Sequence, residues 1–294
     1  MSRKQKMHEP IQADFETVLG AIADEQKPPQ GTLQARPFVK WVGGKRSILP
    51  DLLARMPKEY GTYHELFVGG AALFFAVQPK SAYLSDINFH LVMTFQAVRD
   101  DVVGLIRNLK IHESRHDKDY YYRARTRLFR EKDPVKIAAL VIYLNKTCYN
   151  GLYRVNKSGG FNVPMGDYKD PLIVDEENLE NCSRVLQGVE ITQHSFAQRK
   201  VKAGDFYYLD PPYHKTYTGY DGSGFGDQEH EALAAYCDGI NSAGGLFMLS
   251  NSNTDFVRSL YKTYRIEMVA ASRSVSCKGE QRGKENEIIV RNYE

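Results

Sequence analysis

The sequence of 294 residues is poor in cysteine and has no long apolar run, and both absences exclude classes of protein. The cysteines lie far apart and form no Cys-x-x-Cys pair, so neither a zinc knuckle nor a disulfide framework is expected. They are Cys148, Cys182, Cys237 and Cys277. No stretch reaches the roughly 18 apolar residues of a membrane span, and the first residues lack the apolar centre of a secretory signal. We therefore expect a reduced, cytoplasmic protein with no metal and no membrane partner.

Two glycine-rich stretches lack the spacing that defines phosphate-binding loops. The segment KWVGGKRS has Val39 where a phosphate loop has its first glycine, and Arg46 follows Lys45 where serine or threonine is required. The segment GGAALF has adjacent glycines instead of G-x-G-x-x-G, so a pyrophosphate cradle is not indicated. What remains is a turn that presents Lys45 beside Trp41, the only tryptophan. An ammonium suits a ligand carboxylate and an indole suits a flat ligand, although ordinary packing explains Trp41 equally well.

Apolar strands alternate with amphipathic helices through most of the chain. Strands are expected at 63–68, 81–86, 188–193, 205–210 and 245–251, helices at 71–77, 89–110, 227–244 and 254–264, and a closing antiparallel pair at 265–272 and 286–293. Asn88 is the expected N-cap of the long helix 89–110. This alternation is typical of an α/β fold, in which helices cover both faces of a mostly parallel, Rossmann-like sheet.

The first 35 residues are expected to be an extension of this body. Apolar residues form one helical stripe there, and the segment QKPPQG then breaks the pattern as a linker. The stripe consists of Ile11, Phe15, Val18, Leu19 and Ile22. A helix docked on the body is the favoured interpretation, and an arm for DNA or a protein partner is the alternative.

The middle of the chain, residues 111–188, breaks the alternation and is expected to be an inserted module. Helices are expected at 118–129 and 133–147, followed by a hairpin at 149–164 with KSGG as its turn. Between Arg107 and Gly160 there are 13 Lys or Arg and 5 Asp or Glu, so the local charge is 13 − 5 = +8, against +3 for the whole chain. A basic patch with tyrosines is typical of a surface for a phosphate backbone, and a solvated helix face is the alternative.

The hairpin adds side chains that can read the edges of nucleobases. They are Asn150, Arg154, Asn156 and Asn162. Arginine and asparagine bind guanine and adenine bidentately, which favours a sequence-reading role. Capping of the hairpin by the asparagines is the alternative.

The segment YYLDPPYHKT, residues 207–216, predicts a rigid corner at the end of a buried strand. Parallel sheets bind ligands at the carboxyl ends of their strands, which is where Asp210 lies. Pro211 and Pro212 carry no N–H, so their carbonyls face the site without competing donors. Tyr213 offers a ring for a planar base to stack on, a contact of about 1–3 kcal/mol. The corner therefore suits a flat molecule with an exocyclic amine, and a solvated turn is the weaker alternative.

Two further strand ends are candidate cofactor contacts. Gly69 and Gly70 follow the strand at 63–68 and permit close approach of a ligand. Asp86 ends the next strand, 86 − 69 = 17 positions later, where a carboxylate can accept both hydroxyls of a ribose. A plain tight turn is the alternative for the glycines.

These segments together resemble the Dam-type DNA adenine-N6 methyltransferases, the D12 class, in the motif order called the alpha group. The matching segments are FVKWVGGK, ELFVGGAAL, LSDIN, NGLYRVNKSGGFNVP, YLDPPY and SRSVSCKGEQRGKENEIIV. The match covers roughly residues 36–294. The YLDPPY segment alone marks amino-methyltransferases broadly, whereas the hairpin points to the branch that methylates adenine in GATC. The form FVGGAAL departs mildly from the commoner FVGAGS, and residues before 36 have no counterpart in compact family members.

The resemblance implies a catalytic domain at 36–110 and 189–294, a target-recognition domain at 111–188 and an N-terminal extension at 1–35. It implies S-adenosyl-L-methionine as cofactor, double-stranded DNA as partner, and a monomer on DNA in a bacterial or phage-infected cell, with restriction-modification among the roles. The implied catalytic residues are Asp210, Pro211 and Tyr213. The implied cofactor contacts are Trp41, Lys45, Phe67, Gly69, Asp86, Phe196 and Asp210. The implied DNA contacts are Lys40, Tyr149, Asn150, Leu152, Arg154 and Pro164.

Three other functions compete with this interpretation. Methylation of RNA adenine or of protein glutamine would use a similar corner, although the glutamine enzymes usually carry Asn where Asp210 stands. A DNA-binding regulator with an inactive catalytic domain is the non-enzymatic alternative, and the intact Asp86 and Tyr213 argue against it. A restriction endonuclease is not expected, because no Pro-Asp…Glu-x-Lys cluster is evident.

Overall fold

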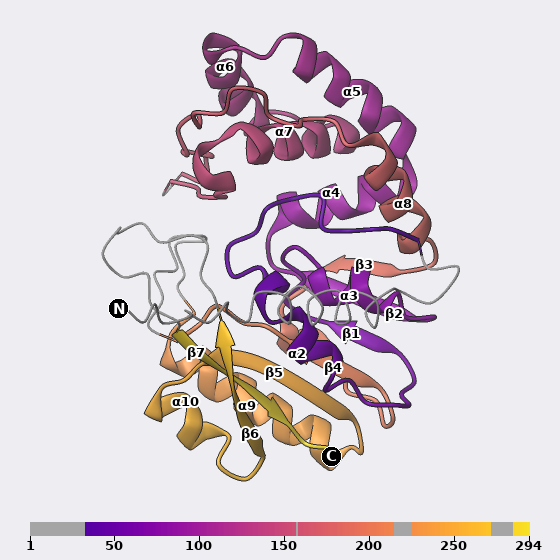
Figure 1. Ribbon diagram of the computed structural model, residues 1–294, viewed down its shortest axis with the longest axis vertical. Helices are drawn as coiled ribbons and strands as arrows, with labels where there is room; N and C mark the ends of the chain where they lie inside the picture. The colour runs from indigo at the N-terminus through magenta and orange to yellow at the C-terminus, as the bar shows by residue number, and fades with distance from the viewer. Residues whose placement is uncertain (1–32, 157, 215–224, 272–284) are drawn as a thin grey trace, which may run out of the picture. The chain divides into compact units, whose positions relative to one another are not determined.

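A seven-stranded sheet runs through the computed structural model, which describes residues 33–156, 158–214, 225–271 and 285–294 (Figure 1). The strand order is β3-β2-β1-β4-β5-β7-β6. The strands are β1 (Tyr63–Glu65), β2 (Ala82–Asp86), β3 (Glu190–Gln193), β4 (Phe206–Leu209), β5 (Leu246–Ser252), β6 (Arg265–Ala271) and β7 (Glu285–Arg291). Neighbours from β3 to β5 pair in parallel, and β7 is antiparallel to both β5 and β6. This confirms the predicted parallel sheet with a closing antiparallel pair.

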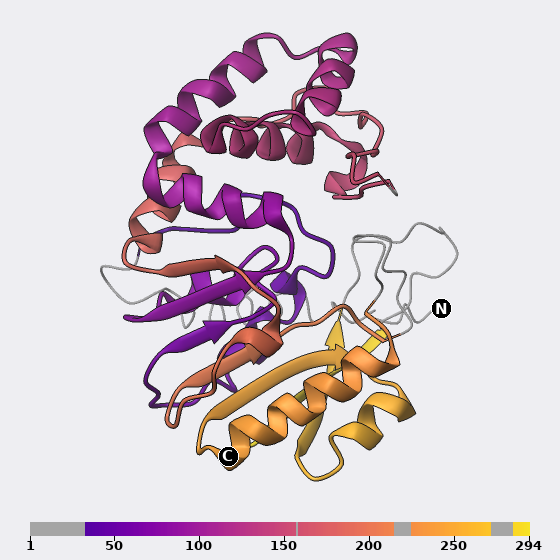
Figure 2. The same ribbon diagram turned by 180° about the vertical axis from the view of Figure 1, so that it is seen from behind.

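Helices bury both faces of the sheet, as the alternation predicts. Along β4, Phe206 and Tyr208 pack into one apolar cluster, while Tyr207 and Leu209 pack into a second. The first cluster includes residues of α2 (Leu49–Leu53), α3 (Ala72–Val77) and α4 (Phe89–Asp100), and the second includes residues of α9 (Asp227–Ser242) and α10 (Asp255–Leu260). Figure 2 shows α9 running along the sheet. All four side chains of β4 are buried, which explains why its sequence is a continuous apolar run instead of an alternating one.

The predicted helix at 89–110 is two helices, and an aspartate separates them. Asn88 caps α4 as expected, since its side chain accepts a hydrogen bond from the Leu91 N–H. The chain then leaves helical geometry at Asp101, whose carboxylate accepts from the Gly104 N–H at 2.9 Å and so starts α5 (Val102–Ser114). An aspartate that can cap a new helix competes with continuation of the old one. The single long helix is therefore a wrong prediction.

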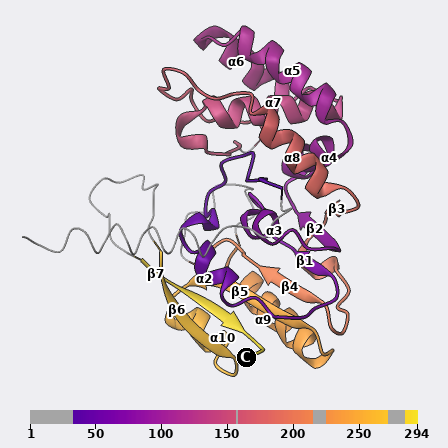
Figure 3. The same ribbon diagram turned by 45° about the vertical axis from the view of Figure 1, so that its right-hand side comes forward.

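The middle of the chain forms a helical module around one buried helix. It consists of α5, α6 (Lys118–Leu128), α7 (Pro134–Thr147) and the loop that follows, and α8 (Glu176–Leu186) leads back to β3. Almost the whole apolar run of α7 is buried, because α4, α5 and α6 all pack on it. Figure 3 shows α5, α6 and α7 grouped together, away from β6 and β7. The boundaries expected for three domains, 1–35, 36–110 with 189–294, and 111–188, stay a prediction.

The expected hairpin at 149–164 turns back on itself, but without continuous strands. Only two isolated antiparallel bridges occur in its described part and at its base, Val155 with Phe161 and Cys148 with Met165. Residues Tyr149–Gly151 form a short 3-10 turn, η2. The Asn156 side chain accepts hydrogen bonds from the N–H groups of Ser158 and Gly160, so a side chain replaces part of the strand ladder at the turn.

Some of the expected features lie outside the residues that the structure describes, and two further expectations concern membrane spans and metal sites. The N-terminal helical stripe and the whole segment SRSVSCKGEQRG, which includes Cys277, lie outside the described residues. In the described part of the chain no helix is long and apolar enough to cross a membrane. The same residues contain no group of three or more His, Cys, Asp or Glu placed to hold a metal ion.

One buried amide joins the helical module to the segment that precedes the sheet. Asn145 of α7 accepts from the Lys40 N–H at 2.7 Å and donates to the carbonyls of Lys40 at 2.8 Å and Gly151 at 2.9 Å. Segments 105 positions apart in the sequence are thus held by a single side chain. Buried backbone groups that lose such a partner keep their desolvation cost, so this contact is expensive to remove.

We expect Asn145→Ala to lower the free energy of unfolding by about 3 kcal/mol, because it leaves three backbone groups unpaired. Urea unfolding followed by circular dichroism measures this. The control is Asn108→Ala, which removes one hydrogen bond within α5 and should cost less than about 1 kcal/mol. Equal losses in the two variants would show that Asn145 is not a link between the segments.

Candidate active site

The register of the sheet brings three predicted site residues to one edge. Glu65 on β1 lies opposite Leu84 on β2 and opposite Tyr208 on β4. Two positions further along these strands stand Phe67, Asp86 and Asp210. The carboxyl ends of parallel strands thus present two carboxylates and an aromatic ring side by side, at the edge where such sheets bind ligands.

A buried ion pair forms the centre of the proline corner at residues 210–213. The ammonium of Lys45 lies 2.9 Å from Oδ2 of Asp210 and also donates to the Gly43 carbonyl. The same ammonium lies 4.7 Å from the centre of the Tyr213 ring, within the range of a cation–π contact. Lys45 is only 5% exposed although it is a lysine, because these partners replace its water. The structure thus places the glycine turn at 43–45 against the proline corner at 210–213.

The Asp210 carboxyl is poised between ionised and neutral forms. Burial raises its pKa to about 6, the Lys45 ammonium opposes that rise, and the nearby Glu287 carboxylate adds to it. Its second oxygen, Oδ1, is buried and has no hydrogen-bond partner among the described residues. A buried, unpartnered acceptor costs free energy, so this oxygen is suited to a donor from a ligand.

The predicted cofactor turn is built closely around Trp41. Gly69 has a φ of +46°, and a Cβ there would lie 3.0 Å from Cδ1 of Trp41, so both the turn and the close approach favour glycine. Asp86 accepts the Gly69 N–H at 3.2 Å and the Asn88 N–H at 2.9 Å. The Trp41 ring also stacks on Tyr153, with centroids 5.4 Å apart. The structure brings Trp41, Gly69 and Asp86 together as predicted, and Trp41 has the packing role that the alternative foresaw.

In the turn before α3, a residue other than glycine occupies a position whose backbone conformation favours glycine. Ala71 has a φ of +55° and precedes the first residue of α3. The commoner family form FVGAGS has glycine at that place, and an L-residue there costs about 1 kcal/mol or more. The change from FVGAGS to FVGGAAL is therefore tolerated by the fold at some cost in stability.

Phe67 and Phe196 form an aromatic cluster at the same sheet edge. Their ring centres are 5.5 Å apart in a stacked arrangement, and Phe225 meets Phe67 edge-on at 5.7 Å. Phe196 lies in η3 (Phe196–Gln198), which a capping box of Ser195 and Gln198 begins. No described contact joins Phe196 to Lys45 or Asp210, so the structure brings Phe196 to Phe67 and not to the corner.

The predicted DNA-contacting residues lie on the loop after α7 and beside it. A Cβ on Gly151 would lie 2.5 Å from Cδ of Lys40, so the Lys40 side chain runs along the η2 turn. Its ammonium lies 4.8 Å from the centre of the Tyr168 ring. Tyr149 is 50% exposed, and its N–H donates to the Pro164 carbonyl. Exposed Asn150 has a φ of +55°, which an asparagine tolerates better than most residues.

The loop at 149–164 also holds its arginine in a defined position. Arg154 donates from Nε to the Asn162 side chain at 2.7 Å and is exposed, while Leu152 is half-buried. Asn162 and Asn156 thus have hairpin-supporting contacts, as the capping alternative foresaw. Arg154 keeps further N–H groups of its guanidinium for a ligand.

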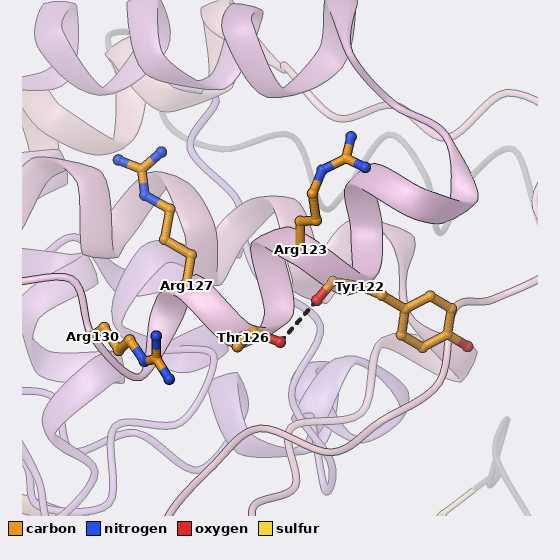
Figure 4. Close-up of a pocket in the computed structure, with 5 residues that line it drawn as sticks. All are labelled: Tyr122, Arg123, Thr126, Arg127 and Arg130. Atoms are coloured by element: carbon orange, nitrogen blue, oxygen red, sulfur yellow. Dashed lines mark hydrogen bonds between the residues drawn. The ribbon is translucent and has the colours of Figure 1, made fainter.

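The basic stretch forms a surface on α6 that is separate from the corner. A pocket of about 570 Å³ is lined by Tyr122, Arg123, Thr126, Arg127 and Arg130. Figure 4 shows these five side chains. Arg127 is paired with Glu131 at 2.7 Å. The turn of the loop approaches the end of this helix, since a Cβ on Gly159 would lie 3.5 Å from the exposed Phe129. Arginines in this density suit phosphate groups.

Sequence reasoning missed three polar residues that shape the corner. Glu287 on β7 accepts a hydrogen bond from the Tyr213 hydroxyl at 2.6 Å. His214 is nearly buried, with its ring nitrogens 3.0 Å from Thr254 and 3.1 Å from Asp227, so it ties the corner to α10 and α9. Burial raises the pKa of Glu65 to about 8, although the Tyr63 hydroxyl donates to it. The contacts of Glu287 with Tyr213 and of His214 with Thr254 join positions far apart in sequence, so no local pattern marks them. Glu65 has a partner two positions away, but its alternation in the strand does not show that it is buried beside the corner.

The comparisons with known proteins agree with this geometry. A family model described as D12 class N6 adenine-specific DNA methyltransferase matches residues 41–275. A type II methyltransferase of Methanocaldococcus jannaschii is 40% identical over 291 residues, covering 89% of this chain and 100% of the relative. One from Lactococcus lactis subsp. cremoris is 37% identical and covers 89% and 96%. The DNA adenine methylase of Escherichia coli strain K12 is 31% identical and covers 87% and 94%.

The sheet order, the proline corner and these relatives define the class of protein, a methyltransferase that acts on DNA. More narrowly, the chain belongs to the D12 class of N6 adenine-specific DNA methyltransferases. Its substrate is therefore DNA adenine, and its reaction needs a methyl donor. The rival functions on RNA, on protein glutamine and as a restriction endonuclease do not match this family.

The raised pKa of Asp210 predicts an acid limit for the enzyme. Below about pH 6 the carboxyl is protonated and loses acceptor capacity, so kcat/KM for DNA methylation should rise with pH and be half-maximal near pH 6. Since Lys45 lowers this pKa, Lys45→Gln should move the midpoint to higher pH. Methylation rates from about pH 5 to about pH 8 measure both effects, with Lys58→Gln on the exposed surface as control. A midpoint that stays in place in Lys45→Gln would mean that another group titrates.

Proposed function

We propose that the protein transfers a methyl group from S-adenosyl-L-methionine to N6 of an adenine flipped out of duplex DNA, within GATC. The observation that carries this proposal is the buried Oδ1 of Asp210, which has no hydrogen-bond partner among the described residues, on the same corner as Tyr213, since Lys45 contacts both side chains. An acceptor and an aromatic face at one corner match a flat base with an exocyclic amine. Flipping costs a few kcal/mol, which stacking and these hydrogen bonds offset.

The residues at the sheet edge fit the methyl donor. Gly69 leaves room for close approach of a ligand. The Asp86 carboxylate lies at the end of β2, accepts the N–H groups of Gly69 and Asn88, and is proposed to hold the ribose hydroxyls. The Phe67 and Phe196 pair supplies an apolar border for an adenine ring. Trp41 lines the turn, and Lys45 has a third N–H for the amino-acid carboxylate after its contacts with Gly43 and Asp210. When bound, the donor supplies a methyl group on a positively charged sulfur.

The corner prepares N6 of the target adenine for reaction. Oδ1 of Asp210 and the carbonyl of Pro211 accept its two hydrogens, which localises the nitrogen lone pair away from the ring. The ion pair with Lys45 holds the carboxylate in place, so Asp210 orients and polarises N6 and need not act as a strong base at the start. Once N6 carries the methyl group it is cationic, and it gives up one proton to Oδ1 of Asp210, from which the proton passes to solvent. The prolines keep the corner rigid and free of N–H groups that would compete for these acceptors.

Duplex DNA is the proposed partner of the helical module, with the enzyme acting as a monomer. Lys40 contacts DNA at the edge of the site, and Tyr149 inserts into the opened stack. Asn150, Leu152, Arg154 and Pro164 contact bases, and their place on one loop supports this role. The arginines of α6 add sequence-independent attraction to phosphates. Residues 111–188 are thus proposed as the target-recognition domain.

Methylation of a plasmid tests the proposed function directly. The purified protein should protect GATC sites against a restriction enzyme blocked by adenine methylation, and a partner enzyme that cuts only methylated GATC should then cleave. Asp210→Ala should lower the methylation rate by about 10³-fold or more, by analogy with the loss of a preorganised polar group, while DNA binding persists in gel shifts. Full activity of this variant, or protection at other sequences only, would contradict the proposal.

Sequence choice should depend on the loop more than on α6. Arg154→Ala should reduce discrimination between GATC and sites with one changed base by about 1–3 kcal/mol. The matched control is Arg123→Ala in the α6 pocket, which should weaken binding to all sequences alike and reduce the salt dependence. Binding to a panel of duplexes at two salt concentrations separates the two. A uniform loss in Arg154→Ala would refute its base-reading role.

A further inference from the structure

The hydroxyl of Tyr213 is fixed by a residue from a distant, reversed strand. Tyr213 Oη donates to Oε2 of Glu287 at 2.6 Å, a short contact across 74 positions of sequence. Glu287 lies opposite Ser252 on β5 and Val269 on β6. Because β7 is antiparallel to its neighbours, its first residues reach the edge where β4 and β5 end (Figure 1). The strand thus delivers a carboxylate to the corner from the opposite chain direction.

The Tyr213 ring is restrained by contacts of different kinds, and two of them are with charged side chains. The Lys45 ammonium lies against the ring at 4.7 Å from its centre, and the Glu287 carboxylate holds the hydroxyl at the ring's far end. A hydrogen bond to a carboxylate is stronger than one between neutral groups and fixes direction as well as distance. A tyrosine without it could rotate about its χ angles and lose alignment with a stacked base.

We propose that Glu287 is a positioning residue of the methyl transfer. It acts through Tyr213, holding the ring in the plane on which the flipped adenine stacks while Lys45 covers part of the ring. This inference rests on the proposed function, because it assigns Tyr213 as the stacking platform. Glu287 itself touches neither the base nor the methyl donor in this assignment.

The charges around the corner support this role. Asp210 pairs with the Lys45 ammonium at 2.9 Å, and the Glu287 carboxylate contributes to the raised pKa of Asp210. The phenol of Tyr213 keeps its proton, since burial first and then the two carboxylates raise its pKa well above the usual value. It therefore remains a donor to Glu287 over the working pH range.

The test compares three variants with the wild-type enzyme on one duplex that contains GATC. Glu287→Ala and Tyr213→Phe each remove the hydrogen bond, and each should lower kcat by about 10- to 100-fold with little change in KM for DNA, as misplacement at a reaction centre does. The double variant should be no slower than the slower single variant, because both break the same contact. Glu287→Gln keeps an acceptor and should retain kcat within about threefold.

A fluorescent readout separates positioning from a loss of folding. With 2-aminopurine at the target position, Glu287→Ala should still extrude the base but should show weaker stacking quench than wild type. The control is Glu267→Ala, which removes a carboxylate paired with Arg55 and Arg291 on the adjacent strand and should leave kcat unchanged.

Several results would overturn the inference. Tyr213→Phe with full kcat would do so even where Glu287→Ala does not fold. Losses that multiply in the double variant, or a Glu287→Gln enzyme as slow as Glu287→Ala, would also do so. Failure of the proposed function is a separate result, because it would appear as a wild-type enzyme that does not methylate the duplex.

Discussion

The Lys45–Asp210 ion pair is the contact on which the site depends. It joins two segments that are 165 positions apart in the sequence (210 − 45). A glycine turn carries the lysine, and a strand end stiffened by prolines carries the aspartate. A buried charge without a partner is costly, so removing either residue would leave the other unsatisfied. The pair also leaves one carboxylate oxygen free. The fold thereby keeps an acceptor in an enclosed place where water does not compete for it.

The sheet explains why residues from distant segments meet there. Parallel strands all end at the same edge, so Phe67, Asp86 and Asp210 become neighbours through register alone. The helical module is joined to this edge by Asn145, whose amide holds the backbone at both Lys40 and Gly151. The loop proposed to read DNA and the segment that carries Trp41 and Lys45 therefore share one anchor. A displacement of the loop would therefore also displace the segment that carries Trp41 and Lys45.

Much of this arrangement could be predicted from the sequence, because it depends on local signals. Buried strands such as FYYL, the Asn88 cap and the strand-end aspartates are visible in short windows. They predicted the sheet correctly, and the register brings Asp86 and Asp210 to one edge of it. The break at Asp101 was not predicted. An aspartate within a stretch of helical apolar periodicity is equally compatible with an exposed position inside one helix and with the cap of a new helix. The loop at 149–164 was expected to pair as strands, and its asparagines instead satisfy the backbone themselves.

The contacts that could not be predicted are those between distant polar side chains. Glu287 stands in an apolar strand whose alternation says only which face it occupies, and its contact with Tyr213 depends on the reversed direction of β7. That strand has a consequence for biosynthesis. It is inserted between β5 and β6 although it follows both in the chain, so a nascent polypeptide can form the earlier strands while the edge of β5 is still open. The hydrogen bond between Tyr213 and Glu287 can therefore form only after β7 has been synthesised, so this corner is completed later than the strands that carry the rest of it.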